Sequence, residues 1–387
     1  MKTPKIRFKC QTGKEFPEWS STKIGEILEI KHGKDYKNLP LGDIPVLGTG
    51  GVITYVSSFL CNWPCVLIGR KGTINKPQFM DNPFWSVDTL FYSKPKEQNS
   101  PKFQYYLFQT INWLKYSEAT GVPSLSASTI ENIVRSIPCL EEQQKIASFF
   151  STLDQKVELN ERKLEALEKL KKGLMQKIFD HEFSFKNKEG KKFPEWGKIY
   201  LKNILHFQNG INTNKENFGA GIKLISVNEV LSSFPIKYDD ISSSVMVDEE
   251  VREKFSVSYG DVLFQRSSET REDAGTSNVY IDNNREAVFG GFVIRGKRIG
   301  DYNPIFLHEL LRSQMVRQQI VKYAQGAQHI NIGQESLEKI EINLPCREEQ
   351  EKIAELAIAL YKKIELLTNK VEGLKNLKKG FMQQMFV

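Results

Sequence analysis

The sequence lacks any apolar run that approaches the roughly 18–20 residues needed to cross a membrane. It also lacks a charged start followed by an apolar core, the pattern of a secretory signal, because residues 1–5 read MKTPK. Cysteine is scarce, and an odd count of five in 387 residues argues against a disulfide framework and favours a reducing compartment. These absences exclude a membrane protein, a disulfide scaffold and a secreted enzyme, so we expect a cytoplasmic protein.

Signatures of catalysis are absent as well. The sequence has no GxxxxGK[ST] phosphate loop, no GxSxG nucleophile elbow and no HExxH pair. Residues 82–84 (NPF) lack the second proline of the Asn/Asp-Pro-Pro-aromatic motif that an amino-methyltransferase would carry. The five histidines show no ligand spacing, and Cys61 and Cys65 have no second ligand pair nearby, so packing is the favoured interpretation of these two. We therefore expect no catalytic residue, no cofactor and no metal site in this chain.

Charge and composition leave the function open. Lys plus Arg number 54 and Asp plus Glu 47, and the resulting net charge of +7 permits a polyanionic partner without requiring one. With 40% hydrophobic and 26% charged residues, the composition is typical of a globular protein, and the length allows two or three domains.

The main positive signal is an internal repeat. Residues 13–19 (GKEFPEW) recur as residues 190–196 (GKKFPEW), at an offset of 177. Residues 137–143 (IPCLEEQ) and 170–176 (LKKGLMQ) recur at an offset of 207 as LPCREEQ and LKKGFMQ. The chain therefore has two copies of one plan, in which a globular block of divergent sequence precedes a helical block. A divergent centre in a constant frame indicates two readers with different targets.

We predict four segments: globular block 1 at residues 1–140, a first helix at 141–180, globular block 2 at 181–345 and a second helix at 346–387. Apolar residues in both helices step by three and four, as in a coiled coil. Neither helix can bury this seam alone, so we expect the two to pair, antiparallel if a pseudo-twofold axis relates the copies. The predicted seam and partner-interface residues are Phe150, Leu153, Val157, Leu164, Leu167 and Leu174 with Leu360, Ile364, Leu367, Val371 and Leu374.

Polar residues interrupt this seam. Asn160 is either a register lock or a helix edge that is open to water. The last turns are rich in lysine, for which helix-dipole placement and solubility are favoured over phosphate contact. These lysines are residues 169, 171, 172 and 177, with 375, 378 and 379. Cys139 and Cys346 occupy equivalent boundary positions, which indicates packing.

Each globular block mixes short β-like runs with one amphipathic helix, which predicts a mixed α/β fold of the α+β type. The expected strands lie within residues 44–56, 64–75 and 84–92 of block 1 and within 222–230, 261–268 and 278–294 of block 2. The expected helices cover residues 102–117 and about 304–323.

A strand that ends in an Arg-bearing loop occurs in both blocks, at residues 66–71 (VLIGRK) and 262–267 (VLFQRS). Arginine at a loop tip suits bidentate contact with guanine or with phosphate, and a surface salt bridge is the alternative. We hypothesise that Arg70 and Arg266 each serve one half of a DNA site, because both copies carry this residue.

Three further kinds of loop suit nucleic acid. The basic loop around Gly33 suits phosphate, its amide-rich counterpart after Gly210 suits adenine, and polar loops follow both predicted helices. Ordinary turn chemistry explains such residues equally well. The candidate DNA-binding residues are Lys34, Tyr36, Lys37, Arg70, Lys71, Asn75 and Ser124 in block 1 and Asn212, Asn214, Lys215, Arg266, Ser267, Arg271, Gln328, His329 and Asn331 in block 2.

Together these motifs resemble the DNA-specificity subunit of type I restriction–modification systems, over essentially the whole chain. The helical blocks open with Pro-Cys-x-Glu-Glu-Gln-x-Lys-Ile-Ala and close with Leu-Lys-Lys-Gly-x-Met-Gln. The resemblance implies that each block is a target recognition domain reading one half of a bipartite double-stranded DNA site. It implies that the helices set the spacer and dock two methyltransferase subunits, which recruit two restriction–translocation subunits in defence against foreign DNA.

The resemblance also implies that this chain is not catalytic. S-adenosylmethionine would belong to the modification subunits, and ATP with magnesium to the restriction subunits. Two other interpretations stay open from the residues alone. A coiled-coil adaptor that binds only protein would show no sequence-dependent DNA binding, whereas a lone DNA-modifying enzyme would turn over substrate when purified.

Overall fold

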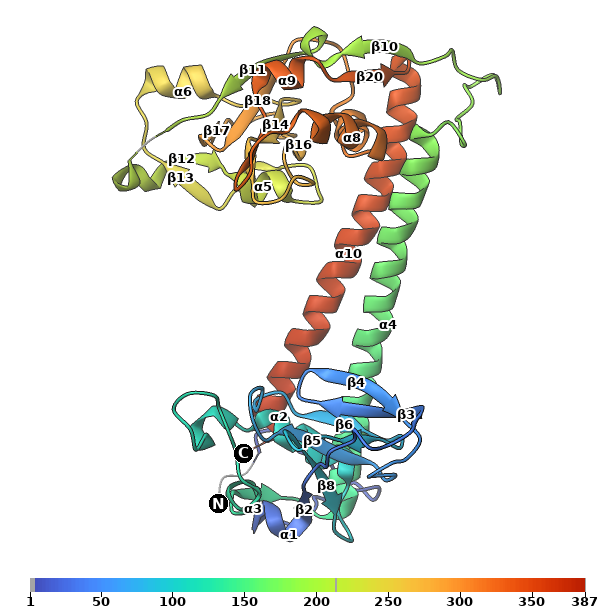
Figure 1. Cartoon of the computed structure of the whole chain (residues 1–387), viewed down its shortest axis with the longest axis vertical. Coiled ribbons are helices and arrows are strands. Elements are labelled where there is room, and N and C mark those ends of the chain that lie inside the picture. Colours follow the sequence, from blue (N-terminus) through green and yellow to red (C-terminus); the bar gives the residue numbers. More distant parts are fainter. Residues whose placement is uncertain (1–3, 213, 387) are drawn as a thin grey trace. The chain divides into compact units, whose positions relative to one another are not determined.

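The computed structural model describes residues 4–212 and 214–386, without the side chain of Lys215. The chain forms two compact units, unit 1 (Met1–Arg162 with Asn369–Val387) and unit 2 (Lys163–Thr368). Two long helices, α4 (Leu140–Phe179) and α10 (Arg347–Met385), contribute to both units (Figure 1). Each unit thus groups one globular block with the helix segments beside it, whereas our four predicted segments separate blocks from helices.

Globular block 1 lies in unit 1. Its strands are β1 (Ser20–Lys23), β2 (Leu28–Lys31), β3 (Leu41–Gly48), β4 (Gly51–Val56), β5 (Cys65–Gly69), β6 (Gln78–Met80), β7 (Trp85–Ser86), β8 (Leu90–Pro95) and β9 (Val134–Ile137). Its helices are α1 (Ile24–Ile27), α2 (Pro101–Thr110), the 3-10 turn η1 (Trp113–Tyr116) and α3 (Ala127–Glu131).

Globular block 2 lies in unit 2. Its strands are β10 (Gly197–Tyr200), β11 (Leu205–Asn209), β12 (Phe218–Ile225), β13 (Ser243–Val245), β14 (Val262–Gln265), β15 (Ser267–Ser268), β16 (Ser277–Val279), β17 (Val288–Phe289), β18 (Val293–Arg298), β19 (Ile330–Asn331) and β20 (Glu341–Leu344). Its helices are α5 (Val227–Leu231), α6 (Glu249–Phe255), α7 (Pro304–Leu311), α8 (Gln314–Tyr323) and α9 (Gln334–Glu338), with 3-10 turns η2 (Leu201–Asn203), η3 (Lys215–Asn217) and η4 (Tyr238–Asp240).

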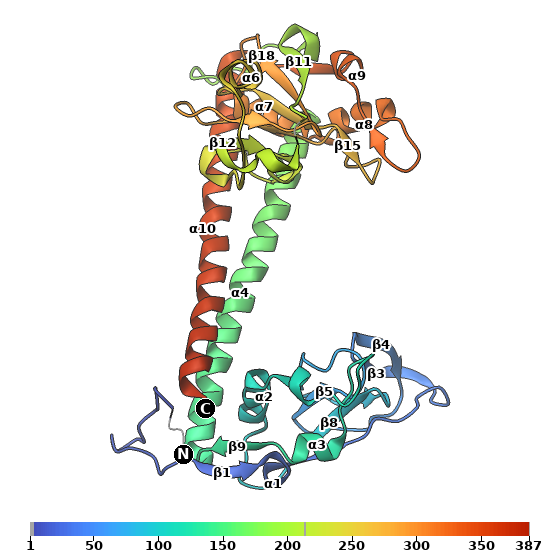
Figure 2. The same ribbon diagram turned by 90° about the vertical axis from the view of Figure 1, so that its left-hand side faces the viewer.

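The two blocks share one sheet topology although they share little sequence. Block 1 has a four-stranded antiparallel sheet β2-β8-β5-β6 and a three-stranded sheet β4-β3-β7, and block 2 repeats these as β11-β18-β14-β16 and β13-β12-β17. Strands of both sheets of block 1, β5 and β8 with β3 and β4, are labelled in Figure 2. In each three-stranded sheet one pair is parallel, β3 with β7 and β12 with β17. A two-stranded ribbon, β1-β9 or β10-β20, leads into the long helix. The predicted mixed α/β fold is confirmed.

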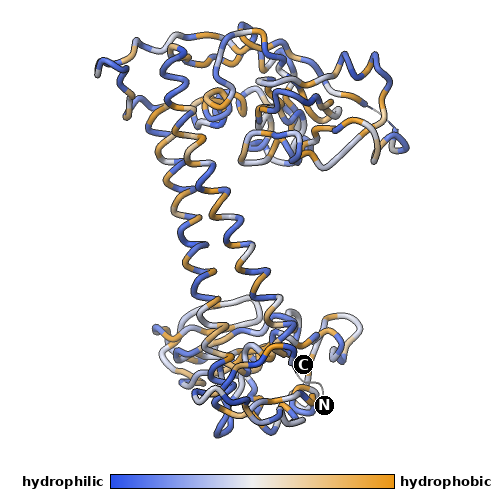
Figure 3. Tube along the Cα trace, turned by 180° about the vertical axis from the view of Figure 1, so that it is seen from behind, coloured by the Kyte–Doolittle hydropathy of each residue, from blue (hydrophilic) through white to orange (hydrophobic). Residues whose placement is uncertain are grey.

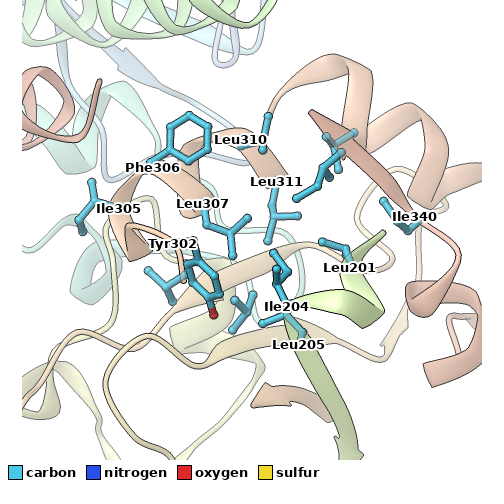
Figure 4. Close-up of a cluster of buried hydrophobic side chains, with 14 of the residues drawn as sticks. Leu201, Ile204, Leu205, Tyr302, Ile305, Phe306, Leu307, Leu310, Leu311 and Ile340 are labelled. Carbon is cyan, nitrogen blue, oxygen red and sulfur yellow. The ribbon is translucent and has the colours of Figure 1, made fainter. Parts of the chain in front are cut away.

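One buried helix packs against the four-stranded sheet of each block, α2 in block 1 and α7 in block 2. Both begin with a proline after a capping residue, Ser100 or Asn303, whose side chain accepts from the first-turn backbone. All eight residues of α7 are buried, and its Leu307 and Leu311 side chains lie on the side of Leu201 and Ile204 (Figure 4). This helix therefore forms the centre of the core of unit 2.

The predicted extent of these helices is wrong in both blocks. The first ends at Thr110 rather than at residue 117, because Ile111 is extended (ψ 129°) and the Trp113 indole N–H turns back to donate to the Phe108 carbonyl at 2.9 Å. In block 2 the predicted single helix is two helices, since Ser313 is extended (ψ 151°) and is the N-cap residue of α8.

The repeated Glu-Glu-Gln motif joins each long helix to its block. The Gln143 side chain donates to the Pro138 carbonyl at 3.0 Å and accepts from the backbone N–H of Ser100 at 2.9 Å. Gln350 repeats both bonds, with Pro345 at 2.9 Å and with Asn303 at 2.8 Å. The same glutamine thus fixes the start of the long helix to the start of α2 or α7.

The prolines of this motif are buried, but Cys139 and Cys346 are exposed. The packing role that we predicted for these two cysteines is therefore wrong. Cys61 and Cys65 are fully buried with their sulfurs 3.8 Å apart, which confirms that they are core residues.

The second glutamate of the motif accepts a hydrogen bond from the tryptophan of the repeated Phe-Pro-Glu-Trp segment. Trp19 Nε1 donates to Glu142 at 3.0 Å, and Trp196 Nε1 donates to Glu349 at 3.0 Å. In unit 1 Arg7 also donates to Glu142 at 2.8 Å, and this bond raises the pKa of the guanidinium. Ser184 stands at the position of Arg7 in the second copy, so Glu349 has no such cation.

A lysine of each long helix anchors a second contact with the block. In unit 1 Lys378 lies 2.5 Å from Asp154 on α4, which also accepts from the Tyr106 hydroxyl on α2 at 2.8 Å. In unit 2 Lys171 lies 2.7 Å from Glu309 on α7, which also accepts from the Tyr361 hydroxyl on α10.

Each unit thus has a triad of a lysine, an acid and a tyrosine. The elements that carry the acid and the tyrosine are exchanged between the two units. The acid is on the long helix in unit 1 and on the block helix in unit 2. Burial raises the pKa of both tyrosines, which keeps their hydroxyls protonated as donors. Helix-dipole placement therefore does not account for Lys171 and Lys378.

Polar and apolar residues alternate along both long helices (Figure 3). Within unit 1, Phe149 packs edge-on against Phe381, and Lys375 pairs with Glu161 at 2.7 Å, so the two chain directions are opposite there. Phe150, Leu153, Leu360, Ile364 and Val371 are buried, whereas the other predicted seam residues are half-buried; these are Val157, Leu164, Leu167, Leu174, Leu367 and Leu374.

The seam polar residue Asn160 is also buried and donates to the Lys156 carbonyl of its own helix at 2.6 Å, which argues against an edge open to water. None of the helices in the described residues is long and apolar enough to cross a membrane.

We predict that the same substitution destabilises the protein at only one of the two equivalent glutamates. Glu142→Gln should destabilise unit 1 by about 3–5 kcal/mol, because it removes the charge that pairs with Arg7 in a buried site. Burial raises the pKa of the Glu349 carboxyl, because the folded state disfavours the charged form. Unit 2 therefore loses free energy of unfolding as the pH rises through that pKa. Glu349→Gln removes this loss and should be neutral or stabilising at pH 7.

Hydrogen exchange of backbone amides in β1 and β10 during urea titration separates the two effects by unit. Equal destabilisation by both variants would contradict the role assigned to Arg7.

Candidate nucleic-acid interface

The backbone of the predicted arginine is held in the same way in both blocks. The N–H of Arg70 donates to the Thr89 carbonyl at 2.8 Å, and that of Arg266 donates to the Phe292 carbonyl at 2.8 Å. Thr89 and Phe292 belong to a short segment between strands, residues 86–89 in block 1 and 289–292 in block 2, which we name the central turn. The arginine therefore lies beside the central turn in each block.

The arginine carbonyl in turn holds the loop that follows the block helices. Arg70 accepts from the backbone of Leu125 at 2.9 Å, and Arg266 accepts from that of Ile332 at 3.0 Å. Bridges then pair Lys71 with Ser124 in block 1, and β15 with β19 in block 2. The second pairing places Ser267 opposite Asn331, so the structure brings these predicted residues together.

The glycine loops meet the central turn from another direction. The N–H of Lys34 donates to the Ser86 carbonyl at 2.7 Å, and the N–H of Ile211 donates to the Phe289 carbonyl at 2.9 Å. A Cβ on Gly33 would lie 2.0 Å from the Val87 carbonyl oxygen, and one on Gly210 would lie 2.1 Å from that of Gly290. Glycine is therefore required at both positions by close backbone approach.

The arginine loop and the glycine loop thus meet at the central turn, and the loop after the block helices joins them through the arginine loop. Sequence reasoning missed the central turn. The strands expected within residues 84–92 and 278–294 are present, but turns divide each run. The first divides into β7 and β8, and the second into β16, β17 and β18. Asp88-Thr89 and Gly290-Gly291 are turn-forming pairs inside these runs and were the available signal.

Most candidate side chains are exposed. Lys34, Lys37, Lys71 and Asn75 are exposed in block 1, and Asn212, Asn214, Arg271, Gln328, His329 and Asn331 are exposed in block 2. Tyr36, Arg70, Ser124, Arg266 and Ser267 are half-buried. The Asn212 side chain lies against Gly291, whereas Lys37 and Asn75 make no side-chain hydrogen bond with the central turn among the described residues. The side chain of Lys215 lies outside the described residues.

The cationic candidates are not consumed by ion pairs. Arg70 and Arg266 extend toward the central turn, where each guanidinium donates at 3.4 Å to a backbone carbonyl, of Asp88 or Gly291. Within the described part of the chain neither forms a salt bridge, and neither do Lys34, Lys37, Lys71 and Arg271. The salt-bridge interpretation of the two arginines is therefore wrong, and these positive charges remain accessible to an anion such as phosphate.

Apolar side chains also flank the site, and sequence reasoning missed them. Phe292 of the central turn is 70% exposed, and Val52 and Ile53 near the tip of the β3–β4 hairpin are more than half exposed. Ile53 lies beside Gly48, which also faces Val87 of the central turn. No group of three or more His, Cys, Asp or Glu that could hold a metal ion occurs in the described ranges.

This arrangement defines a class of protein with two equivalent loop-based binding blocks, each fixed to a long helix. The chain belongs to the family described as type I restriction modification DNA specificity domain, which matches residues 17–169 and 194–376. The two matches confirm the internal repeat, and the family is one of specificity subunits rather than catalytic ones.

Relatives and solved structures agree with this assignment. The MjaVIII specificity subunit of Methanocaldococcus jannaschii is 26% identical, covering 82% of this chain and 74% of that protein. The putative MjaX specificity subunit of the same organism is 26% identical, covering 93% and 81%. A type I restriction–modification S subunit of M. genitalium has a similar fold (TM-score 0.64, 14% identity, 100% and 99% coverage). A chain from a structural study of type I complex assembly is also similar (TM-score 0.55, 14% identity, 95% and 97% coverage).

We predict that Gly33→Ala and Gly210→Ala displace the glycine loop from the central turn. The added Cβ collides with a backbone carbonyl that cannot move aside cheaply, so each change should destabilise its own block by about 1–3 kcal/mol. Gly50→Ala is the control, because its Cβ would meet nothing within 4 Å. Hydrogen exchange of the central turn and DNA affinity report the effect, and a Gly33→Ala variant indistinguishable from Gly50→Ala in both would contradict it.

Proposed function

We propose that each block is a target recognition domain that reads one half of a bipartite double-stranded DNA site. The observation that carries this proposal is the repeated loop cluster, in which Arg70 and Arg266 have the same backbone partners in blocks of unlike sequence. Arginine offers two parallel donors to guanine or to a phosphate, and the neighbouring amides and hydroxyls suit base edges. Because the side chains around the two arginines differ, the two half-sites differ.

The long helices are proposed to pair as an antiparallel coiled coil with pseudo-twofold symmetry, which sets the spacer between the half-sites. Opposite chain directions at the Phe149–Phe381 and Glu161–Lys375 contacts support this pairing. The helices are also proposed to dock two methyltransferase subunits, which recruit two restriction–translocation subunits. In this assignment S-adenosylmethionine, ATP and magnesium are bound by those partners in the cytoplasm, and this chain binds no cofactor.

The first experiment asks whether each arginine serves its own half-site. Co-expression with the methyltransferase subunit and mapping of methylated adenines identifies the target. Arg70→Ala should then weaken binding through one half-site by about 1–3 kcal/mol if it reads a base, and Arg266→Ala should do so at the other. If the arginine contacts phosphate instead, binding to all sequences falls alike and the salt slope drops by about one.

Arg162→Ala is the charge-matched control, since this exposed helix residue already pairs with Glu158. Unchanged affinity for both Arg70→Ala and Arg266→Ala would exclude the proposed contact. Binding that does not depend on sequence, even with methyltransferase present, would favour the protein-only adaptor instead.

The second experiment concerns the spacer. Inserting a few residues between Asp180 and Phe185, directly after α4, should change the preferred spacer while both half-site sequences stay the same. The methylation map of the variant measures both properties. An altered half-site sequence would contradict the separation of reading and spacing.

A further inference from the structure

Phe292 of the central turn is an apolar ring that the fold leaves in solvent. It is 70% exposed, more than any other aromatic side chain in the described parts of the chain, and it makes no ring contact with another aromatic there. A single exposed apolar residue needs no explanation in general. This one lies where the arginine loop and the glycine loop of block 2 meet, so its position is informative.

The backbone beneath the ring is fixed on both sides. The Phe292 carbonyl accepts from the N–H of Arg266 at 2.8 Å, and the N–H of Val293 donates to the Gly290 carbonyl at 2.9 Å. The N–H of Gly290 donates in turn to the Ile225 carbonyl at 3.0 Å, and Val293 is fully buried. Because the turn is already ordered, holding the ring against a partner costs little conformational entropy.

The fold does not require a phenylalanine at this position. Thr89 occupies the corresponding place in block 1, where its carbonyl accepts from Arg70 as that of Phe292 does from Arg266. Thr89 is half-buried and carries no ring. Leaving a ring in water also forgoes the burial that usually makes a phenylalanine stabilising. Since the same backbone arrangement forms without a ring, the ring contributes nothing that the fold of block 2 needs.

The surroundings of the ring favour DNA over a protein surface. Two loop segments meet the central turn of block 2, residues 210–212 and 266–268, and the structure describes all of them. On these segments and on residues 289–292, no apolar side chain other than that of Phe292 is exposed. The aromatic anchors of protein interfaces lie instead among further apolar contacts that exclude water. An isolated ring is therefore a poor anchor for a protein.

Polar groups that suit DNA lie beside the ring. The Arg266 guanidinium donates to the Gly291 carbonyl at 3.4 Å and forms no salt bridge within the part of the chain that the structure describes. The Asn212 side chain is exposed and also lies against Gly291. Arginine suits phosphate or guanine, an amide suits adenine, and an apolar ring can enter the stack between two base pairs. Gly290 and Gly291 place no side chain beside the ring, so the turn can approach the base pairs closely.

We propose that Phe292 is a wedge that enters between two adjacent base pairs of the half-site bound by block 2. Arg266 and Asn212 contact phosphate or base edges next to the opened step. Unstacking costs least at pyrimidine–purine steps such as TA and CA, so we expect the ring at one of these. Thr89 has no ring to insert, so the half-site of block 1 stays stacked at the matching place. The inference rests on the proposed function, and it adds a deformation of the DNA at one half-site.

Fluorescence of 2-aminopurine measures the unstacking. This adenine analogue brightens when it leaves the stack, and it replaces in turn each adenine of the half-site and its flanks except the methylated one. The full-length chain with its methyltransferase subunit should raise the signal at one step of the half-site bound by block 2. Phe292→Ala should abolish that rise and weaken binding about tenfold, whereas Phe292→Leu keeps an apolar wedge and most of the rise.

Phe59→Ala is the matched control. Phe59 is an exposed phenylalanine of block 1 that makes no ring contact with another aromatic among the described residues, so its loss should leave the signal at the half-site of block 2 unchanged. Hydrogen exchange of β17 and β18 checks that the Phe292 variants keep the fold of the block, as the exposure of the ring predicts.

Three results would overturn the wedge and leave the proposed function standing. The first is an undiminished fluorescence rise in Phe292→Ala. The second is the absence of a rise in the unmodified complex, with an equal loss of affinity from Phe292→Ala and from replacing one thymine by uracil, because the ring then contacts only a thymine methyl group. The third is weaker binding of methyltransferase to Phe292→Ala without DNA. Binding of the unmodified complex that does not depend on DNA sequence would instead overturn the proposed function, and the wedge with it.

Discussion

The fold depends on a few buried polar residues at the start of each long helix. A buried carboxylate or amide is costly unless all of its polar atoms have partners. Glu142 and Gln143, like Glu349 and Gln350, meet this condition only when three segments come together. These segments are the tryptophan near the start of the block, the first turn of the block helix and the proline before the long helix. The motif therefore positions the whole block on its helix.

The triads add a second constraint, which distinguishes the two blocks. Exchanging the blocks would bring Glu309 toward Asp154, and two carboxylates would then share one lysine. It would also bring Tyr106 toward Tyr361, which would leave Lys171 without an acid. The first arrangement places two like charges in a partly buried site, and the second leaves a charge there without a partner. Both cost free energy of folding. The exchange of acid and tyrosine thus gives each block one favourable position, although the scaffold around it is repeated.

Structural features that follow a regular apolar spacing or an internal repeat could be predicted from the sequence. The points at which a helix ends could not. The long helices follow from apolar spacing that extends over about 40 residues, and two independent copies agree on it. The ends of α2 and α7 were missed because Ile111 and Ser313 leave the helix for tertiary reasons, such as the bond from Trp113 to Phe108. The exposed Cys139 and Cys346 were also misjudged, because it is the neighbouring prolines that are buried. Their equivalence reflects the repeat of the backbone and not burial of the sulfur.

The candidate site shows why sequence located its loops but not their meeting point. The loops are joined to the central turn by backbone groups, from Arg70 to Thr89 and from Arg266 to Phe292, and such bonds leave little trace in side-chain identity. The same property separates architecture from specificity. Because the backbone holds the cluster together, the side chains on it are free to differ, as Lys71 and Ser267 do. Gly33 and Gly210 are the exception to this freedom. They cannot be replaced by a larger residue, because a backbone carbonyl occupies the space that a Cβ would need. One scaffold can therefore present two unlike surfaces without a change in its core.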